Sequence, residues 1–192
     1  MAKPGVVSKK ELIQSAKKCI AEKGIDKLTL KAVAEGAKVT QGTVYYHFRT
    51  KEQLLLQIVE DVCQESWQNV QQSPTDQRLE KALNGAKARC TKDAIYHSLF
   101  FSLVAAGLTQ DKIRERIGKL LQEENEVLTN QLSESWKRSP IKGISFRDWG
   151  TLMNALIDGL ALQALMNPDF SPERTYEAVE ALVHYLQKEK GE

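Results

Sequence analysis

The chain has 192 residues, 42% of them hydrophobic, which suits one globular domain or two small ones. Its apolar runs are far shorter than the roughly 20 residues of a membrane-spanning helix, and residues 1–10 contain no apolar signal region, so we expect a cytoplasmic protein without a membrane partner. The net charge of +2 hides an asymmetry, since residues 1–51 carry 11 Lys or Arg against 4 Asp or Glu and the remainder carries 16 against 21. This asymmetry predicts an N-terminal part that binds a polyanion; a lysine-rich surface that only contacts water is the alternative.

The residue types that build catalytic and metal sites are scattered along the chain. Cys19, Cys63 and Cys90 are widely spaced within helical patterns, which predicts buried reduced thiols, with a redox sensor as the alternative. The three histidines lie on separate helical segments, and the chain contains no H-E-x-x-H, glycine-rich phosphate loop or nucleophile elbow. We therefore expect no metal, no cofactor and no enzymatic activity.

Apolar residues recur at helical spacing along the whole chain, which predicts an all-α fold of about nine helices. A first helix is expected between Ser8, which can cap it, and Gly24. A second begins after Thr29 and stops near Gly36, and a third begins at Thr40. Two short helices joined by a tight turn containing glycine are typical of a helix-turn-helix.

The third predicted helix has a composition that suits an exposed binding surface better than a core. Only Val44 and Phe48 form an apolar stripe, while the other positions are polar, aromatic or imidazole side chains. Such side chains can contact base edges and phosphates. Gly42 costs about 1 kcal/mol in a helix, so it indicates close approach to a DNA backbone or, alternatively, tight contact with another helix.

The segment between Leu12 and Leu55 resembles the DNA-binding domain of the TetR family of bacterial transcriptional regulators. The resemblance is carried above all by L-T-L-K-A-V-A-E-G-A-K-V-T-Q-G-T-V-Y-Y-H-F-R-T-K-E-Q-L. It implies a three-helix DNA-binding domain in residues 1–51 and a helical ligand-binding and dimerisation domain in residues 52–192. The expected partner is double-stranded operator DNA.

Matched residue by residue, the resemblance implies a set of DNA-binding side chains in and around the third helix. Hydroxyls and lysines suit phosphate, and glutamine can pair with adenine. A packing role is the alternative for the histidine of this set. The set comprises Thr29, Lys31, Thr40, Gln41, Gly42, Thr43, Tyr45, Tyr46, His47 and Lys51.

Six further helices are predicted, and all but the first lie beyond Pro74. They cover a segment from Lys51 to just before Ser73, then residues 78–89, 93–106, 110–137, 146–166 and a last segment opened by Ser171 and Pro172. The last two have apolar faces broader than one neighbour needs. The resemblance implies that they form a homodimer interface, with an intramolecular core as the alternative.

Aromatic and sulfur-containing residues in the second half predict a pocket for a small apolar or amphipathic inducer, although such residues more often form core. Asp158 lies on the predicted helix over residues 146–166, and its carboxylate needs a partner. A ligand amine, Arg147 or a capping donor can supply one, and we favour a salt bridge within the protein. The candidate ligand contacts are Trp67, Tyr96, His97, Phe100, Trp149, Met153 and Asp158.

These features together predict a dimeric repressor that binds a pseudo-palindromic operator and is released by an inducer. One alternative is a DNA-binding regulator without a small-molecule ligand, controlled by a protein partner or by its own abundance. A second is a helical small-molecule binder or enzyme in which the helix-turn-helix is incidental.

Overall fold

The computed structural model describes residues 7–91 and 95–188, and every regular element within these residues is helical. The elements are α1 (Lys9–Lys23), η1 (Ile25–Lys27), α2 (Leu30–Gly36), α3 (Gln41–Phe48), α4 (Lys51–Gln71), η2 (Thr75–Gln77), α5 (Arg78–Arg89), α6 (Ile95–Gly107), α7 (Asp111–Trp136), α8 (Phe146–Met166) and α9 (Pro172–Lys188). The predicted all-α fold is confirmed, and the expected start of the sixth helix at Asp93 lies outside the described residues. No described helix is long and apolar enough to cross a membrane.

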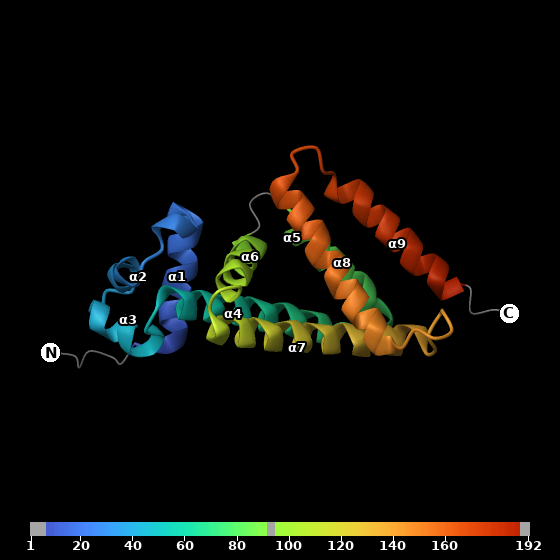
Figure 1. The fold of residues 1–192 in the computed structure, drawn as a ribbon, viewed down its shortest axis with the longest axis horizontal. Coiled ribbons are helices and arrows are strands. Elements are labelled where there is room, and N and C mark those ends of the chain that lie inside the picture. The colour runs from blue at the N-terminus through green and yellow to red at the C-terminus, as the bar shows by residue number, and fades with distance from the viewer. Residues whose placement is uncertain (1–6, 92–94, 189–192) are drawn as a thin grey trace.

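The molecule is elongated, with α1–α3 at one end and α8 and α9 at the other (Figure 1). The long helices α4 and α7 run along its length and connect the two ends. The helix starts follow the predicted capping residues. The hydroxyls of Ser8, Thr29 and Thr40 each accept a hydrogen bond from a backbone N–H in the first turn, and Ser8 forms a full capping box with Glu11.

The turn between α2 and α3 differs from the expectation of a glycine-containing turn. Lys38 is the residue with positive φ, at 55°, and the N–H groups of Lys38 and Val39 donate to the carbonyls of Glu35 and Ala34 in a Schellman motif. Gly36 instead ends α2 beside α1, where a Cβ atom would lie 2.6 Å from the Ser15 hydroxyl. A side chain here would displace the Ser15 hydroxyl from its hydrogen bond with the Val33 carbonyl, so the glycine serves the packing of α1 against α2.

The largest apolar core joins the N-terminal helices to the rest of the protein. One face of α4 contributes Leu54, Leu55, Ile58 and Val59 to a cluster that also contains buried residues of α1, α2, α3, α6 and α7. The ion pair of Lys17 with Asp61, at 2.6 Å, and a second with Glu65 fasten α1 to α4 at the edge of this cluster. The helices α1–α4 therefore pack as one body.

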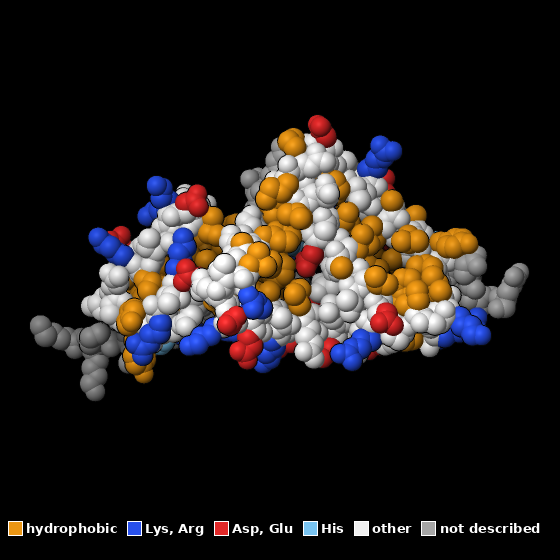
Figure 2. Space-filling view, in the orientation of Figure 1, with side chains coloured by type: hydrophobic (Ala, Val, Ile, Leu, Met, Phe, Trp, Pro, Cys, Tyr) orange, Lys and Arg blue, Asp and Glu red, His pale blue; other side chains and the backbone are white. Residues whose placement is uncertain are grey.

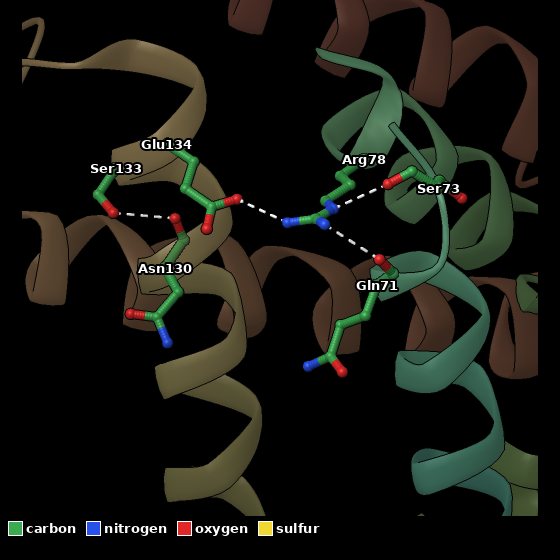
Figure 3. Close-up of polar contacts among 6 residues, drawn as sticks. All are labelled: Gln71, Ser73, Arg78, Asn130, Ser133 and Glu134. Atoms are coloured by element: carbon green, nitrogen blue, oxygen red, sulfur yellow. Dashed lines mark hydrogen bonds and ion pairs between the residues drawn. The ribbon is translucent and has the colours of Figure 1, made fainter. Parts of the chain in front are cut away.

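The other end of α4 is fixed by Arg78, the first residue of α5 (Figure 3). Its guanidinium donates to the carbonyl oxygens of Gln71 and Ser73 at the end of α4 and to the carboxylate of Glu134 on α7, all at 3.0–3.1 Å. These bonds satisfy carbonyl groups that a helix end leaves without partners. They also connect α4, α5 and α7 at one point.

An apolar surface covers α8 and α9. Figure 2 shows hydrophobic side chains gathered over this half of the molecule. Helix α9 packs against the core through Val179, Val183 and Leu186. Residues on its opposite side are also apolar. The exposed large hydrophobic residues of the two helices are Leu152, Leu162, Met166, Leu182 and Tyr185, with exposed fractions of 42–72%.

Helices α7 and α8 are in close contact at Gly150. A Cβ atom at this position would lie 2.2 Å from the Thr129 hydroxyl, 2.6 Å from the Asn125 carbonyl oxygen and 2.9 Å from the Thr129 nitrogen. Two of these atoms belong to the backbone of α7, so they cannot rotate away. This contact sets the distance between α7 and α8.

We predict that Gly150→Ala lowers the free energy of unfolding by about 1–3 kcal/mol, because the methyl group forces the two helices apart. Chemical denaturation monitored by circular dichroism measures the change. Gly118→Ala on α7 is the matched control, since no atom lies within 4 Å of a Cβ there. The control variant should be neutral or stabilised by up to about 1 kcal/mol, and equal losses in both variants would contradict the packing argument.

Candidate functional site

Helix α3 presents a polar and aromatic surface at the end of the molecule. Val44 and Phe48 are 0% and 1% exposed and anchor the helix in the core, whereas Gln41 is exposed and Tyr45 and Tyr46 are 52% and 72% exposed. Tyrosine combines an apolar ring with a polar hydroxyl and is enriched at interfaces. The structure thus separates the two anchors from the predicted contact residues, as the sequence predicts.

The remaining predicted contact residues surround this surface. The Thr29 and Thr40 hydroxyls cap α2 and α3 and are exposed, as is Lys31, while Thr43 and His47 are half-buried. His47 is in edge contact with the Tyr46 ring, with centroids 5.3 Å apart. The structure places these side chains at one end of the molecule, near the N-termini of α2, α3 and α4.

Two cations lie next to the aromatic residues of α3. The Arg49 guanidinium lies 5.3 Å from the centroid of the Tyr45 ring. Lys51, the first residue of α4, is half-buried, and its ammonium donates to the Ile25 carbonyl at 3.2 Å. An ammonium group has three donors, so this bond orients Lys51 and leaves donors for a further acceptor.

The surroundings of Gly42 decide between the two explanations for a glycine within α3. The residue is exposed, and the nearest atom to a Cβ would be the Thr40 hydroxyl at 3.6 Å, an ordinary van der Waals distance. Tight contact with another helix is therefore wrong. The open space lies on the side of the exposed polar residues.

A cavity of about 70 Å³ lies between α4, α5, α6, α7 and α8. Four predicted ligand contacts line it, namely Trp67, Tyr96, His97 and Asp158. The other three lie elsewhere. Phe100 belongs to the core shared with α1, Met153 to the core between α7, α8 and α9, and Trp149 packs edge-on against Trp136 at 5.3 Å while its Nε1 donates to the Ser139 hydroxyl.

Glu124 on α7 is the centre of a polar cluster in the cavity wall. Its carboxylate accepts a hydrogen bond from the Tyr96 hydroxyl at 3.0 Å and a longer one from the Cys63 thiol at 3.5 Å. Burial raises the pKa of Glu124, and the hydrogen bonds of Tyr96 and Cys63 oppose this change. The pKa values of Tyr96 and Cys63 are also raised, first by burial and then by the Glu124 charge.

Asp158 on α8 is the second carboxylate at the cavity. Burial, with a contribution from the Glu124 charge, raises the pKa of Asp158 to about 7. No hydrogen bond or ion pair to its carboxylate is present within the described residues, so the favoured salt bridge within the protein, to Arg147 or another donor, is wrong. Asp158 thus faces the cavity without a protein cation of its own.

The remaining polar groups of the wall are a histidine, an arginine and an amide. Burial lowers the pKa of His97 to about 4, so the ring is neutral near pH 7, and its Nδ1 lies 3.2 Å from the Arg89 carbonyl. The Arg89 guanidinium donates to the Ser66 hydroxyl at 3.1 Å. Gln131 is 7% exposed, and its Oε1 is buried without a hydrogen-bond donor.

Glu124, Gln131 and Arg89 line the cavity but are not predicted from the sequence. On α7, Glu124 lies four residues after Leu120 and four before Leu128, which are both buried. It therefore occupies a position of the buried stripe where an apolar residue is expected. An acidic residue within an otherwise apolar helical stripe is therefore the sequence signal that could have identified Glu124.

The three cysteines are free and buried, as predicted. Because the pKa of the Cys63 thiol is raised by burial, the reactive thiolate is disfavoured, which argues against the redox-sensor alternative. The described residues include no group of three or more His, Cys, Asp or Glu side chains that can hold a metal ion.

Known structures share this fold. A transcriptional regulator from Rhodococcus sp. Rha1 superposes with a TM-score of 0.66 at 20% identity, over 95% of this chain and 97% of that one. The fatty acid degradation regulator FadR from Bacillus halodurans superposes with a TM-score of 0.69 at 15% identity, over 96% and 100% of the two chains. At these identities the likeness shows the arrangement of helices.

Sequence comparison finds relatives among bacterial regulators. A probable acrEF/envCD operon repressor of Escherichia coli is 29% identical over 137 residues, which are 63% of this chain and 60% of that protein. A fatty acid metabolism regulator protein of Bacillus subtilis is 27% identical over 128 residues, 64% of this chain and 61% of that protein. The chain thus aligns with about three fifths of the length of these relatives.

Family models account for most of the chain. The model for bacterial regulatory proteins of the tetR family matches residues 12–58, which include α2, α3 and the start of α4. The model for the C-terminal part of BetI-type transcriptional repressors matches residues 76–188, more than half of the chain. The chain belongs to the TetR family of bacterial transcriptional regulators.

Proposed function

We propose that this protein is a transcriptional repressor that binds a pseudo-palindromic DNA operator as a homodimer and is released by a small-molecule inducer. The observation that carries the proposal is the exposed polar face of α3, anchored by Val44 and Phe48 and flanked by lysine and arginine side chains. A short helix of this kind fits the major groove of DNA. The basic excess of residues 1–51 adds attraction to phosphate.

Within this proposal the residues divide by chemistry into base and phosphate contacts. Gln41 at the start of α3 suits an adenine edge, and Tyr45 and Tyr46 suit the sugar-phosphate backbone or thymine methyl groups. Thr29, Thr40, Thr43, His47, Lys31 and Lys51 suit phosphate, and the open space beside Gly42 allows a DNA backbone to approach. Residues 1–51 are the DNA-binding part, and residues 52–192 bind ligand and dimerise.

The dimer is proposed to form through α8 and α9. Both helices are buried on one side and carry exposed leucine, methionine or tyrosine on the other. On α8 the exposed Leu152, Gly159 and Met166 are seven residues apart, which is the spacing of a helix-packing seam. A second copy supplies an identical seam, and two-fold symmetry matches a palindromic operator.

Helix α4 connects the proposed DNA-binding and ligand-binding parts. Lys51 lies at its first turn beside α3, and Cys63, Ser66 and Trp67 lie at or beside the cavity. Inducer binding releases DNA if the inducer binds more tightly to an arrangement of α4 that does not fit the operator. The cavity favours this mode over a regulator without a ligand, for which a fully packed C-terminal part is expected. The Escherichia coli relative is named as a probable operon repressor, which supports repression rather than activation of transcription.

The DNA-binding proposal is tested by selecting duplexes from a random pool and measuring variants on the selected sequence and on a scrambled one. We predict that Gln41→Ala weakens binding to the selected sequence by about 1–3 kcal/mol and leaves binding to the scrambled one nearly unchanged, because it removes a base contact. Lys31→Ala should weaken binding to both sequences equally, because it removes a phosphate contact. The slope of log affinity against log salt concentration should also become shallower by about one.

Lys119→Ala is the matched control for these variants. Lys119 on α7 is 78% exposed and lies 3.8 Å from Glu123, much as Lys31 is 73% exposed and lies 4.0 Å from Glu35. Its loss should leave DNA binding unchanged. If Gln41→Ala has no effect on the selected sequence, or if no sequence is selected, the proposed interface is wrong.

For the dimer, we predict that Leu182→Arg produces a monomer of 21.6 kDa in light scattering, because it places a charge on the exposed apolar surface of α9. Operator affinity should fall by at least about a hundredfold, since the two half-sites are no longer bound together. Leu108→Arg, at a leucine that is 73% exposed between α6 and α7, is the control and should remain dimeric. A dimeric Leu182→Arg protein would refute the assignment of this surface.

A further inference from the structure

The wall of the cavity between α4 and α8 contains hydrogen-bond acceptors that no donor within the described residues satisfies. The carboxylates of Glu124 and Asp158 and the amide oxygen of Gln131 all line it. Glu124 accepts hydrogen bonds from Tyr96 and Cys63, but no donor within the described residues reaches the Asp158 carboxylate or Gln131 Oε1. A buried acceptor without a donor costs about 1–3 kcal/mol, so the fully buried Gln131 Oε1 needs a reason. The half-buried Asp158 carboxylate is a second acceptor in the same cavity wall.

The cations near the cavity do not supply these donors. Arg89 is the only Lys or Arg among the described residues that line it, and its guanidinium donates a hydrogen bond to the Ser66 hydroxyl. Arg78, at the start of the same helix, directs three nitrogens to the end of α4 and to Glu134 (Figure 3). His97 is neutral because burial lowers its pKa to about 4. Among the described residues that line the cavity, two carboxyl groups thus accompany one cation.

We propose that the cavity binds the protonated amine group of a small molecule, with N–H donors directed to Asp158 and Gln131 and with the adjoining carbon chain against Trp67. This inference rests on the proposed function, because it names the class of molecule that acts as the inducer. The apolar walls contributed by Val70, Val127 and Ile157 suit a hydrocarbon chain.

The geometry favours an amine with N–H groups over a quaternary ammonium ion or an alcohol. A quaternary ion carries the charge but no donor, so it leaves Gln131 Oε1 unsatisfied. An alcohol supplies one donor but no charge, so it cannot form the charge-assisted hydrogen bond that a protonated amine makes with the Asp158 carboxylate. A volume of about 70 Å³ accommodates a primary amine head group with a short chain.

The test uses n-butylamine, butyltrimethylammonium and 1-butanol, each titrated into the full-length protein near neutral pH and followed by calorimetry and thermal unfolding. We expect saturable binding of n-butylamine with an affinity at least about tenfold above that of the other two. Equal affinities, tighter binding of either analogue, or no binding of n-butylamine would overturn the proposal.

Variants locate the bound amine. Asp158→Asn should reduce n-butylamine affinity at least about tenfold, whereas Asp169→Asn, the same change at an exposed residue between α8 and α9, should not. Gln131→Met should also reduce the affinity, and it should raise the unfolding temperature because it removes an unsatisfied acceptor. Unchanged affinity in both Asp158→Asn and Gln131→Met would overturn the assignment to this cavity.

The two proposals fail separately. Operator selection without amine binding would refute the inducer class and leave the DNA-binding function in place. Amine binding without any selected DNA sequence would refute the regulator and retain the cavity as a site for amines. Release of the selected operator by n-butylamine at concentrations that saturate the cavity supports both.

Discussion

The apolar face of α4 is the constraint on which the rest of the structure depends. Leu54, Leu55, Ile58 and Val59 lie in one core with residues of α1–α3 on one side and of α6 and α7 on the other. A helix that belongs to two groups of neighbours through a single core cannot shift relative to one group without disturbing the other. The exposed face of α3 is thereby held in a fixed relation to the helices that surround the cavity.

The cavity differs from this well-packed core because polar side chains occupy positions of the buried stripe of α7 where apolar ones are expected. Leu120, Leu128 and Leu132 are buried as expected, but Glu124 and Gln131 lie between and beside them on the same face. Each polar residue at such a position lowers stability unless it is paired. An arrangement that stabilised only the folded chain would carry leucine at both positions, so these residues indicate a requirement other than folding.

Local rules of helix formation let the sequence predict most of the fold. Serine and threonine caps, prolines and apolar periodicity place nearly every helix end, and Val44 and Phe48 identify the buried side of α3. The turn after Gly36 could not be predicted because the glycine serves packing against Ser15, a contact between helices distant in sequence. The cavity was predicted only in part for the same reason, since Phe100 and Trp149 have suitable side chains but the assembly of α4–α8 directs them into other cores.

Under the proposed function, the shared core also determines how a small ligand affects DNA. The residues of α4 at the cavity lie about 16 residues from Lys51, a separation of about 24 Å along a helix. Lys17 pairs with Asp61 and Glu65 on α4, so α1 follows this helix, and the core holds α2 and α3 to both. A coupling of about 1–3 kcal/mol, the usual range between two sites, is comparable to the cost of the unpaired Gln131 acceptor in the cavity wall. Satisfying Asp158 and Gln131 can therefore supply the free energy that favours one position of α4 over another.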